Sequence, residues 1–200
     1  MGCHITLRIN DYASLHPNFF QNEKLGAWNR KINKDSHASI IMTKQKQTLR
    51  FEIKINAPKA KVWNTMLHHG TYEEWVNAGW PGSTYEGEWK RSSRIKFFGK
   101  DESGADAGGT VAEIVDIKSH EFVLAKHVAA LLVGGKEDTE SDLAKGWIGT
   151  TENYYFTEVD GVTTLKVEIK TYPDWVEMFQ NGWPKALAKL KELCESRVAK

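Results

Sequence analysis

The sequence predicts an α+β domain in which a curved antiparallel sheet of about six to seven strands wraps around one long C-terminal helix, with two short helices after the first strand. Three observations support this. Residues 51–55 alternate apolar and polar side chains, which is typical of a strand with one buried face. Short segments of high strand propensity, separated by turn formers, fill most of residues 85–170. After them, apolar residues recur every three or four positions, which is typical of an amphipathic helix.

Two short helices are predicted directly after the first strand. Pro58 presets the backbone angle φ of a first helical turn, and apolar residues within 62–67 recur at helical spacing. Thr71 and Glu74 have the spacing of a capping box, in which each side chain bonds a free backbone N–H of the other residue. A second helix is therefore predicted over about residues 72–76.

The remaining strands are predicted from short segments separated by turn formers. They cover about residues 85–89, 94–98, 110–117, 121–128, 152–157 and 163–170. Most of the connections are short, which implies antiparallel neighbours, and the last two segments are expected to form a closing hairpin. One longer link, residues 134–146, is too polar for a core and too long for a hairpin turn, and we interpret it as a mobile lid.

A long amphipathic helix is predicted over about residues 174–197. Its apolar stripe consists of Val176, Phe179, Trp183, Leu187, Leu190 and Cys194. This helix is the only candidate to cover the apolar face of the sheet, and a twisted sheet around one helix is difficult to fill completely, so we expect a cavity between them. Pro184 removes one backbone donor inside the helix and should kink it beside Trp183. On this stripe, Cys194 is expected to be a buried, inert thiol.

Composition and charge restrict the function classes. The 27 Lys and Arg residues nearly balance 26 Asp and Glu residues, so no overall field would hold the chain on nucleic acid or on an anionic membrane. The longest apolar runs, such as residues 128–133, are far shorter than the roughly 20 residues of a membrane span. No signal-peptide pattern is found, and Cys3 and Cys194 lie near opposite ends of the chain. We therefore expect a cytoplasmic protein with free thiols.

Residues 1–47 are interpreted as an N-terminal extension and residues 48–200 as the domain. The apolar residues of the extension keep neither a helical nor a strand period. Met42 stands just before a polar stretch that leads into the first strand, so residues 1–41 can be read as an upstream translation artefact. The first six residues match the N-myristoylation pattern, but so short a motif has poor specificity, and we do not expect lipidation.

Several local motifs occur in a characteristic order. They are residues 57–63 (APKAKVW), 82–89 (GSTYEGEW), 152–156 (ENYYF), 164–165 (TL) and 182–187 (GWPKAL). Over about residues 48–197, this order and spacing resemble the START-like (SRPBCC) superfamily, and within it the bacterial homologues of the activator of the heat-shock chaperone ATPase. The resemblance implies a helix-grip fold with a hydrophobic pocket that binds or converts apolar small molecules. Chaperone activation belongs to larger relatives with an additional N-terminal domain, so we do not expect it here.

No established motif for a metal, a nucleotide or a nucleophile is found. His68 and His69 are adjacent and would point to different sides of a helix, so we do not expect them to share an ion. Asp138, Glu140 and Asp142 alternate like calcium ligands but lack the required glycine and bidentate glutamate. We therefore expect no metal and no cofactor.

The leading hypothesis is a carrier or sensor for a hydrophobic or aromatic small molecule. The candidate ligand-binding residues are Trp75, Phe97, His127, Trp147, Tyr154, Phe156, Phe179 and Trp183. The ligand would lie near Phe179 and Trp183, while His127 and Tyr154 orient it through hydrogen bonds. Large aromatic residues at these spacings are more often plain core, and no catalytic residue is assigned.

Two alternatives stay open. The first is an enzyme of the cyclase or hydrolase type, implied by the resemblance, which would need an acid–base pair in the pocket. The polar residues that could act in a pocket are His127, Glu113, Glu152 and Tyr154, and of these His127 could serve as a general base. The second is a protein-interaction module, like a co-chaperone, that docks through exposed aromatic side chains such as Trp80 and Trp147. Such a patch could also form a homodimer.

Overall fold

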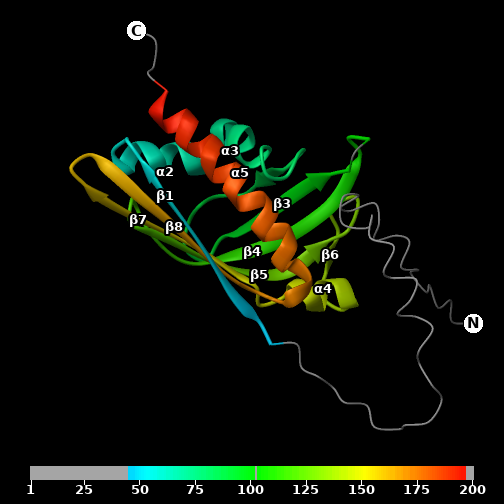
Figure 1. Ribbon diagram of the computed structural model, residues 1–200. Coiled ribbons are helices and arrows are strands. Elements are labelled where there is room, and N and C mark those ends of the chain that lie inside the picture. The colour runs from blue at the N-terminus through cyan, green and yellow to red at the C-terminus, as the bar shows by residue number, and fades with distance from the viewer. Residues whose placement is uncertain (1–44, 102, 197–200) are drawn as a thin grey trace, which may run out of the picture.

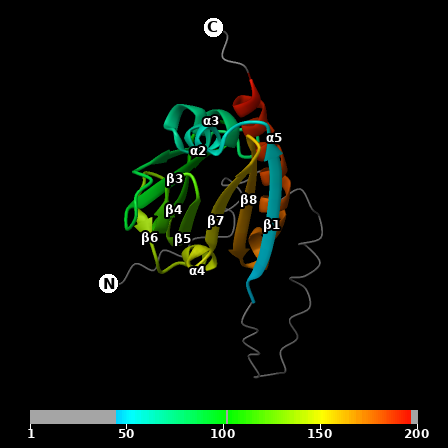
Figure 2. The same ribbon diagram turned by 90° about the vertical axis from the view of Figure 1, so that its left-hand side faces the viewer.

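The computed structural model describes residues 45–101 and 103–196, which form an antiparallel sheet crossed by one long helix (Figure 1). The strands are β1 (Gln47–Ile55), β2 (Thr84–Glu86), β3 (Arg94–Lys100), β4 (Asp106–Lys118), β5 (Phe122–Leu131), β6 (Glu137–Asp138), β7 (Thr151–Val159) and β8 (Val162–Thr171). The helices are α2 (Lys59–Leu67), α3 (His69–Val76), α4 (Asp142–Trp147) and α5 (Val176–Glu195), and a 3₁₀ helix, η3 (Pro173–Trp175), precedes α5. In both views, α2 and α3 lie at one end of the sheet and α4 at the other (Figures 1 and 2).

The strand order is β1-β8-β7-β5-β4-β3-β2, and β6 pairs with β5 at the side of this path. All pairs are antiparallel, and the first strand joins the last one, from Gln47 opposite Thr171 to Ile55 opposite Thr163. The predicted antiparallel sheet is therefore confirmed. Its eight strands exceed the expected number because β6 forms inside the segment that the sequence suggested was a lid.

The hairpin of β7 and β8 is also confirmed. Val159 pairs with Val162, and the two residues between them, Asp160 and Gly161, have positive φ angles of 52° and 75°. Two such residues make the tight turn whose twist matches that of the flanking strands, and the Asp-Gly sequence favours it.

The starts of the two short helices differ from the prediction. Pro58 has extended backbone angles (φ −60°, ψ 146°) and precedes α2, which begins at the next residue. Helix α3 begins at His69, so Thr71 lies inside its first turn, and its hydroxyl donates to the carbonyl of His68 at 3.1 Å. The predicted capping box of Thr71 and Glu74 is therefore wrong, because the helix starts two residues before the cap it required.

Helix α5 buries the predicted stripe. Phe179, Trp183, Leu187, Leu190 and Cys194 are each at most 4% exposed, and they belong to the core that the sheet and the short helices complete. The chain before residue 176 forms a 3₁₀ turn rather than the expected first turn of the α-helix. Pro184 lies inside α5, and the kink expected there stays a prediction.

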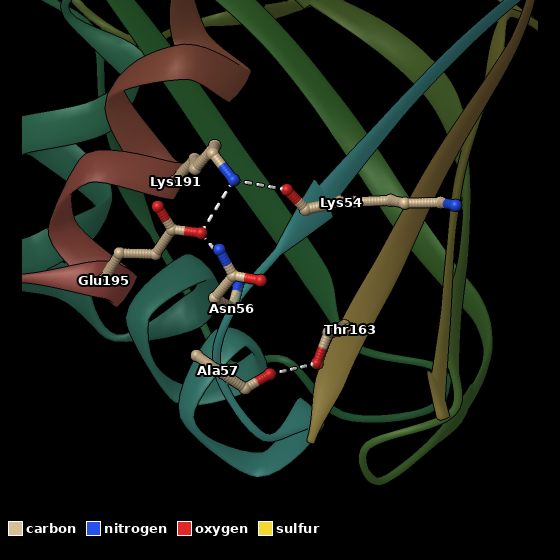
Figure 3. Close-up of polar contacts among 6 residues, drawn as sticks. All are labelled: Lys54, Asn56, Ala57, Thr163, Lys191 and Glu195. Carbon is tan, nitrogen blue, oxygen red and sulfur yellow. Dashed lines mark hydrogen bonds and ion pairs between the residues drawn. The ribbon is translucent and has the colours of Figure 1, made fainter. Parts of the chain in front are cut away.

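The C-terminal end of α5 is fastened to the end of β1 (Figure 3). Lys191 donates to the carbonyl of Lys54 and to Glu195, each at 2.6 Å, and Glu195 also accepts the backbone N–H of Asn56 at 2.6 Å. The hydrogen bond from Lys191, followed by that from the Asn56 backbone, lowers the pKa of the Glu195 carboxyl. These bonds hold the C-terminal end of α5 against the end of β1 and so fix the position of the helix relative to the sheet.

The segment over residues 134–146 contains regular structure. Strand β6 pairs with the end of β5, and Glu137 bonds Arg94 of β3 at 2.6 Å. Ser141 caps α4, since its hydroxyl accepts the backbone N–H of Ala144 at 3.1 Å. These bonds anchor the segment to the sheet and place α4 beside β5.

Some expectations lie outside the described residues. They concern a start at Met42, the acylation motif, Cys3 and residues 1–44 of the N-terminal extension, whose last residue, Gln47, is already the first residue of β1. Across residues 45–101 and 103–196, no helix combines the length and the apolar character that crossing a membrane would require.

Candidate ligand-binding cavity

A cavity of about 360 Å³ lies between α5 and the sheet, partly open to solvent. Its walls come from α3 and the turn after it, from β3, β4, β5 and β7, and from α4, η3 and α5. Seven of the eight candidate residues line it, namely Trp75, Phe97, His127, Trp147, Tyr154, Phe179 and Trp183. The structure places these seven residues around one cavity. Their role in binding a ligand stays a prediction.

Phe156 does not line the cavity. It is buried on the same face of β7 as Tyr154, but two residues further along the strand, where α2 covers the sheet. There its ring meets Trp63 edge-on, with 5.2 Å between the ring centroids. Phe156 is therefore a core residue under α2. The alternation of a strand predicts the face on which a side chain lies but not which part of that face borders the cavity, so the sequence could not distinguish Phe156 from Tyr154.

Trp183 forms the centre of one wall. Its ring stacks with Phe51, at 6.3 Å between centroids, and with Trp75, at 6.0 Å, while the Tyr154 ring lies 5.9 Å away. Trp183 is 1% exposed, and its indole Nε1 has no hydrogen-bond partner among the described residues. By contrast, Nε1 of Trp75 donates to the carbonyl of Met66 at 3.0 Å. The cavity wall therefore contains one buried donor that the protein leaves unsatisfied.

The opposite wall is a pair of stacked indoles. Trp147 of α4 and Trp175 of η3 lie 4.3 Å apart between centroids, at an interplanar angle of 28°. Trp175 Nε1 donates to the carbonyl of Gly146 at 3.0 Å, and Phe179 meets Trp147 edge-on at 6.1 Å. Trp175, Leu143 and Met178 also line the cavity, although none was a candidate residue. For Trp175, the density of aromatic residues around 172–183 was a usable signal.

Trp80 and Trp147 were expected as exposed docking residues, and the structure corrects this. Trp147 is only 8% exposed, Trp80 is half-buried, and both line the cavity. The large hydrophobic side chains that are exposed among the described residues are Val115, Val133, Tyr155 and Val159.

A polar cluster lies in the floor of this largely aromatic cavity. His127 of β5 is 5% exposed, and its Nδ1 lies 3.1 Å from the hydroxyl of Thr110 on β4. His127 Nε2 lies 3.8 Å from one carboxylate oxygen of Glu152, and the hydroxyl of Tyr154 donates to the other oxygen. Glu152 and Tyr154 are two residues apart on β7 and so share one face of the strand. Strands β4, β5 and β7 thus bring four polar side chains together where the sequence alone could not place them.

The environment of this cluster raises the pKa values of two tyrosines, Tyr154 and Tyr72. Burial, followed by the charge of Glu152 and its hydrogen bond, raises the pKa of Tyr154 well above its ordinary value. Burial, again followed by the charge of Glu152, raises the pKa of Tyr72, which also lines the cavity. Both phenols are therefore neutral and able to donate hydrogen bonds at physiological pH.

The other candidate polar residues lie elsewhere. Glu113 is exposed on β4 opposite Lys126 and does not line the cavity, so its suggested place in the pocket is wrong. His68 and His69 are exposed, and Nε2 of His69 lies 3.1 Å from the carbonyl of Tyr85. Within the described part of the chain, no group of three or more His, Cys, Asp or Glu side chains is arranged to hold a metal ion.

Comparisons with known proteins agree with this architecture. The family model "Activator of Hsp90 ATPase homolog 1-like protein" matches residues 56–195. Among solved structures, protein NE0264 from Nitrosomonas europaea is similar with a TM-score of 0.59 and 12% identity, covering 78% of this chain and 97% of that one. The Aha1 dimer from Colwellia psychrerythraea is similar with a TM-score of 0.55 and 16% identity, covering 74% and 96%.

A protein from Staphylococcus epidermidis is also similar, with a TM-score of 0.56 and 18% identity, covering 76% of this chain and 91% of that one. At these identities the likeness shows the fold alone. No match was found among curated proteins. The resemblance and the helix-grip fold predicted from the sequence are confirmed, and this chain belongs to the Activator of Hsp90 ATPase homolog 1-like family.

Proposed function

We propose that this protein is a carrier or sensor that binds a hydrophobic or aromatic small molecule in the cavity under α5. The observation that carries the proposal is a cavity of about 360 Å³ whose walls are mainly apolar and rich in aromatic rings, and whose floor holds a buried polar cluster. Small-molecule sites typically combine such apolar walls with a few precisely placed polar groups.

The size and lining of the cavity suit moderate affinity. A ligand that buries roughly 300 Å² of apolar surface would gain on the order of 7 kcal/mol at about 25 cal/mol per Å². The loss of translational and rotational freedom opposes this gain. Rigid aromatic walls, such as the stacked Trp147 and Trp175, lose little further side-chain freedom on binding. Because the apolar gain alone corresponds to a dissociation constant of about 10 μM, we expect a ligand held only by the apolar walls to bind more weakly than that.

The proposal is tested with the neutral fluorescent probe N-phenyl-1-naphthylamine. Its emission should rise on binding, with one site per chain. Leu143 lines the cavity from α4, whereas Lys145 on the same helix is exposed and does not. Leu143→Trp should fill part of the cavity and weaken probe binding at least about tenfold, while Lys145→Trp should leave it within about twofold.

Both variants are first checked for an unchanged circular dichroism spectrum and melting temperature. The proposal is contradicted if the wild-type protein does not bind the probe, or if both folded variants bind it as the wild type does. In a separate experiment, native mass spectrometry of the purified protein would identify a ligand that co-purifies.

A second candidate function is an enzyme that acts on an apolar substrate in the same cavity. The observation that favours it is the hydrogen bond from Tyr154 to Glu152, with His127 Nε2 3.8 Å from the same carboxylate. Such groups can transfer protons to and from a bound substrate. A change in mass of the bound molecule during incubation with the wild-type protein, absent with Glu152→Gln, would support it. An unchanged ligand would favour the carrier or sensor.

The comparisons also motivate a proposal about assembly. One similar structure is a dimer, the Aha1 dimer from Colwellia psychrerythraea, and we propose that this chain also forms a homodimer. The same native mass spectra give the subunit count, and a monomer at micromolar concentration would contradict it. A cytoplasmic location remains part of the proposal.

A further inference from the structure

The charges that line the cavity have one sign. Three acidic residues, Asp142, Glu152 and Asp174, contribute to its walls, and none of the described lining residues is lysine or arginine. Asp142 and Asp174 are exposed and lie on α4 and η3, while Glu152 lies deeper on β7 with only 18% of its side chain exposed. A ligand that enters the cavity therefore meets negative charge at the entrance and again at the floor.

The Glu152 carboxylate is not fully neutralised by its neighbours. The Tyr154 hydroxyl, a neutral donor, bonds one of its oxygens. The other oxygen lies 3.8 Å from Nε2 of His127, beyond the length of a hydrogen bond, and Nδ1 of that ring lies within hydrogen-bond distance of Thr110. Removing a carboxylate from water is costly unless a cation or several donors compensate it. A positively charged ligand would supply the missing compensation.

The rings beside the imidazole that neighbours this carboxylate suit an organic cation rather than a metal ion. The Trp147 ring centroid lies 5.4 Å from that of His127, and the Phe97 ring lies 6.4 Å from the same imidazole. The faces of aromatic rings attract ammonium groups, most strongly where water is excluded. A metal ion would need several convergent oxygen, nitrogen or sulfur ligands, which this wall does not offer among the described residues.

Trp183 provides a second, separate observation on the same cavity, a buried polar atom without a partner. It is 1% exposed, lines the cavity, and has no partner for its Nε1 donor among the described residues. Its ring centroid lies 5.9 Å from that of Tyr154. A buried donor without an acceptor costs free energy, which a small shift of the Trp183 ring towards an acceptor on the body of the ligand would recover.

We propose that the cavity takes an organic cation, a protonated or quaternary amine on an apolar body, with the ammonium group held at Glu152. This inference rests on the proposed function and assigns the charge of the ligand. The aromatic walls bind the body and Glu152 selects the positive head group.

The test compares three probes of nearly equal shape by isothermal titration calorimetry. They are (1-naphthylmethyl)trimethylammonium, its neutral isostere 1-neopentylnaphthalene, and the anion 1-naphthylacetate. The cation should bind at least about tenfold more tightly than the neutral isostere, and the anion more weakly than both. Glu152→Gln should remove most of the preference for the cation while keeping the affinity for the neutral isostere within about twofold. Glu113→Gln, outside the cavity on β4, is the matched control and should keep the preference.

The outcomes separate the two proposals. If N-phenyl-1-naphthylamine binds and the cation binds no more tightly than the neutral isostere, the inference falls and the proposed function stands. The inference also falls if folded Glu152→Gln keeps the full preference for the cation. If neither N-phenyl-1-naphthylamine nor any of the three probes binds, both fall together.

Discussion

The indole ring of Trp80 lies so close to the backbone at Gly182 that a Cβ atom added there would overlap the ring. The approach is mutual, since a Cβ atom at Gly79 would lie 2.6 Å from the carbonyl oxygen of Gly182. The turn after α3 and the middle of α5 therefore meet at two residues without side chains. This contact holds Trp80 edge-on to Trp183, with 5.6 Å between centroids and 79° between planes. One wall of the cavity thus depends on two glycines.

Alanine at position 182 should destabilise the protein even though alanine is the better helix former. The added methyl group must displace Trp80 or α5, so we expect a loss of about 1–3 kcal/mol in the free energy of unfolding, together with weaker probe binding. Gly70 of α3 is the matched control, because a Cβ there meets nothing closer than 3.8 Å. Gly70→Ala should be neutral or stabilising by up to about 1 kcal/mol. Equal effects of the two substitutions in urea unfolding would contradict the close approach.

Tyr72 and Tyr154 should make the protein less stable at alkaline pH. The pKa of both phenols is raised above the value of about 10 that they have in the unfolded chain. Above pH 10 the unfolded chain therefore loses protons that the native state keeps. Each buried tyrosine should then lower the free energy of unfolding by up to about 1.4 kcal/mol per pH unit, with no effect below that range.

Tyr72→Phe removes one of these groups, so its stability should fall less steeply above pH 10 than that of the wild type. Tyr155→Phe, at a residue that is 38% exposed, is the control and should follow the wild type. A Tyr72→Phe variant with the wild-type slope in urea titrations between pH 9 and 11 would be inconsistent with the raised pKa.

Thr110→Val should expose the dependence of His127 on its hydroxyl partner. Valine has nearly the shape of threonine, so the main change is the loss of the 3.1 Å contact with Nδ1 of a buried imidazole. We expect a loss of about 1–3 kcal/mol in the free energy of unfolding. Thr157→Val, at an exposed position of β7, should change it by no more than about 0.5 kcal/mol. Similar losses for both variants would remove the support for this hydrogen bond.

Cys194 should be unreactive in the native protein. It is 1% exposed on α5, and burial raises the pKa of its thiol, which keeps it protonated. In a Cys3→Ser variant, the remaining thiol should react with Ellman's reagent only as fast as the protein unfolds. Adding Glu192→Cys to a variant that lacks both native cysteines places a thiol at an exposed position of the same helix, which should react rapidly. Rapid labelling of Cys194 without denaturant would show that this end of α5 opens.

The elements with strong local periodicity could be predicted from the sequence. The alternation in β1, the Asp160-Gly161 turn and the apolar stripe of α5 each require one packing arrangement, because any other would expose apolar side chains. The start of α3 could not be predicted, since the helix begins at His69, two residues before the predicted cap at Thr71.

The composition of the site was harder to predict because it depends on relations across strands. Thr110, Val111 and Ala112 are consecutive buried residues at a shift of register between β4 and β5. A period of two therefore could not say which way Glu113 faces. Similarly, the pairing of β5 with β7 sets the distance between His127 and Glu152, and neither strand carries a local signal of the other.

The central claim, that the cavity under α5 binds an apolar small molecule, is tested most directly by the indole N–H signals of the tryptophans in a ¹H–¹⁵N NMR spectrum. Five of the eight tryptophans line the cavity, namely Trp75, Trp80, Trp147, Trp175 and Trp183. Trp63, which belongs to α2, packs against Phe156 and does not line the cavity. Addition of N-phenyl-1-naphthylamine should shift the five cavity signals in proportion to occupancy and leave Trp63 in place. Unchanged cavity signals at saturating probe, or shifts confined to Trp63, would contradict the account.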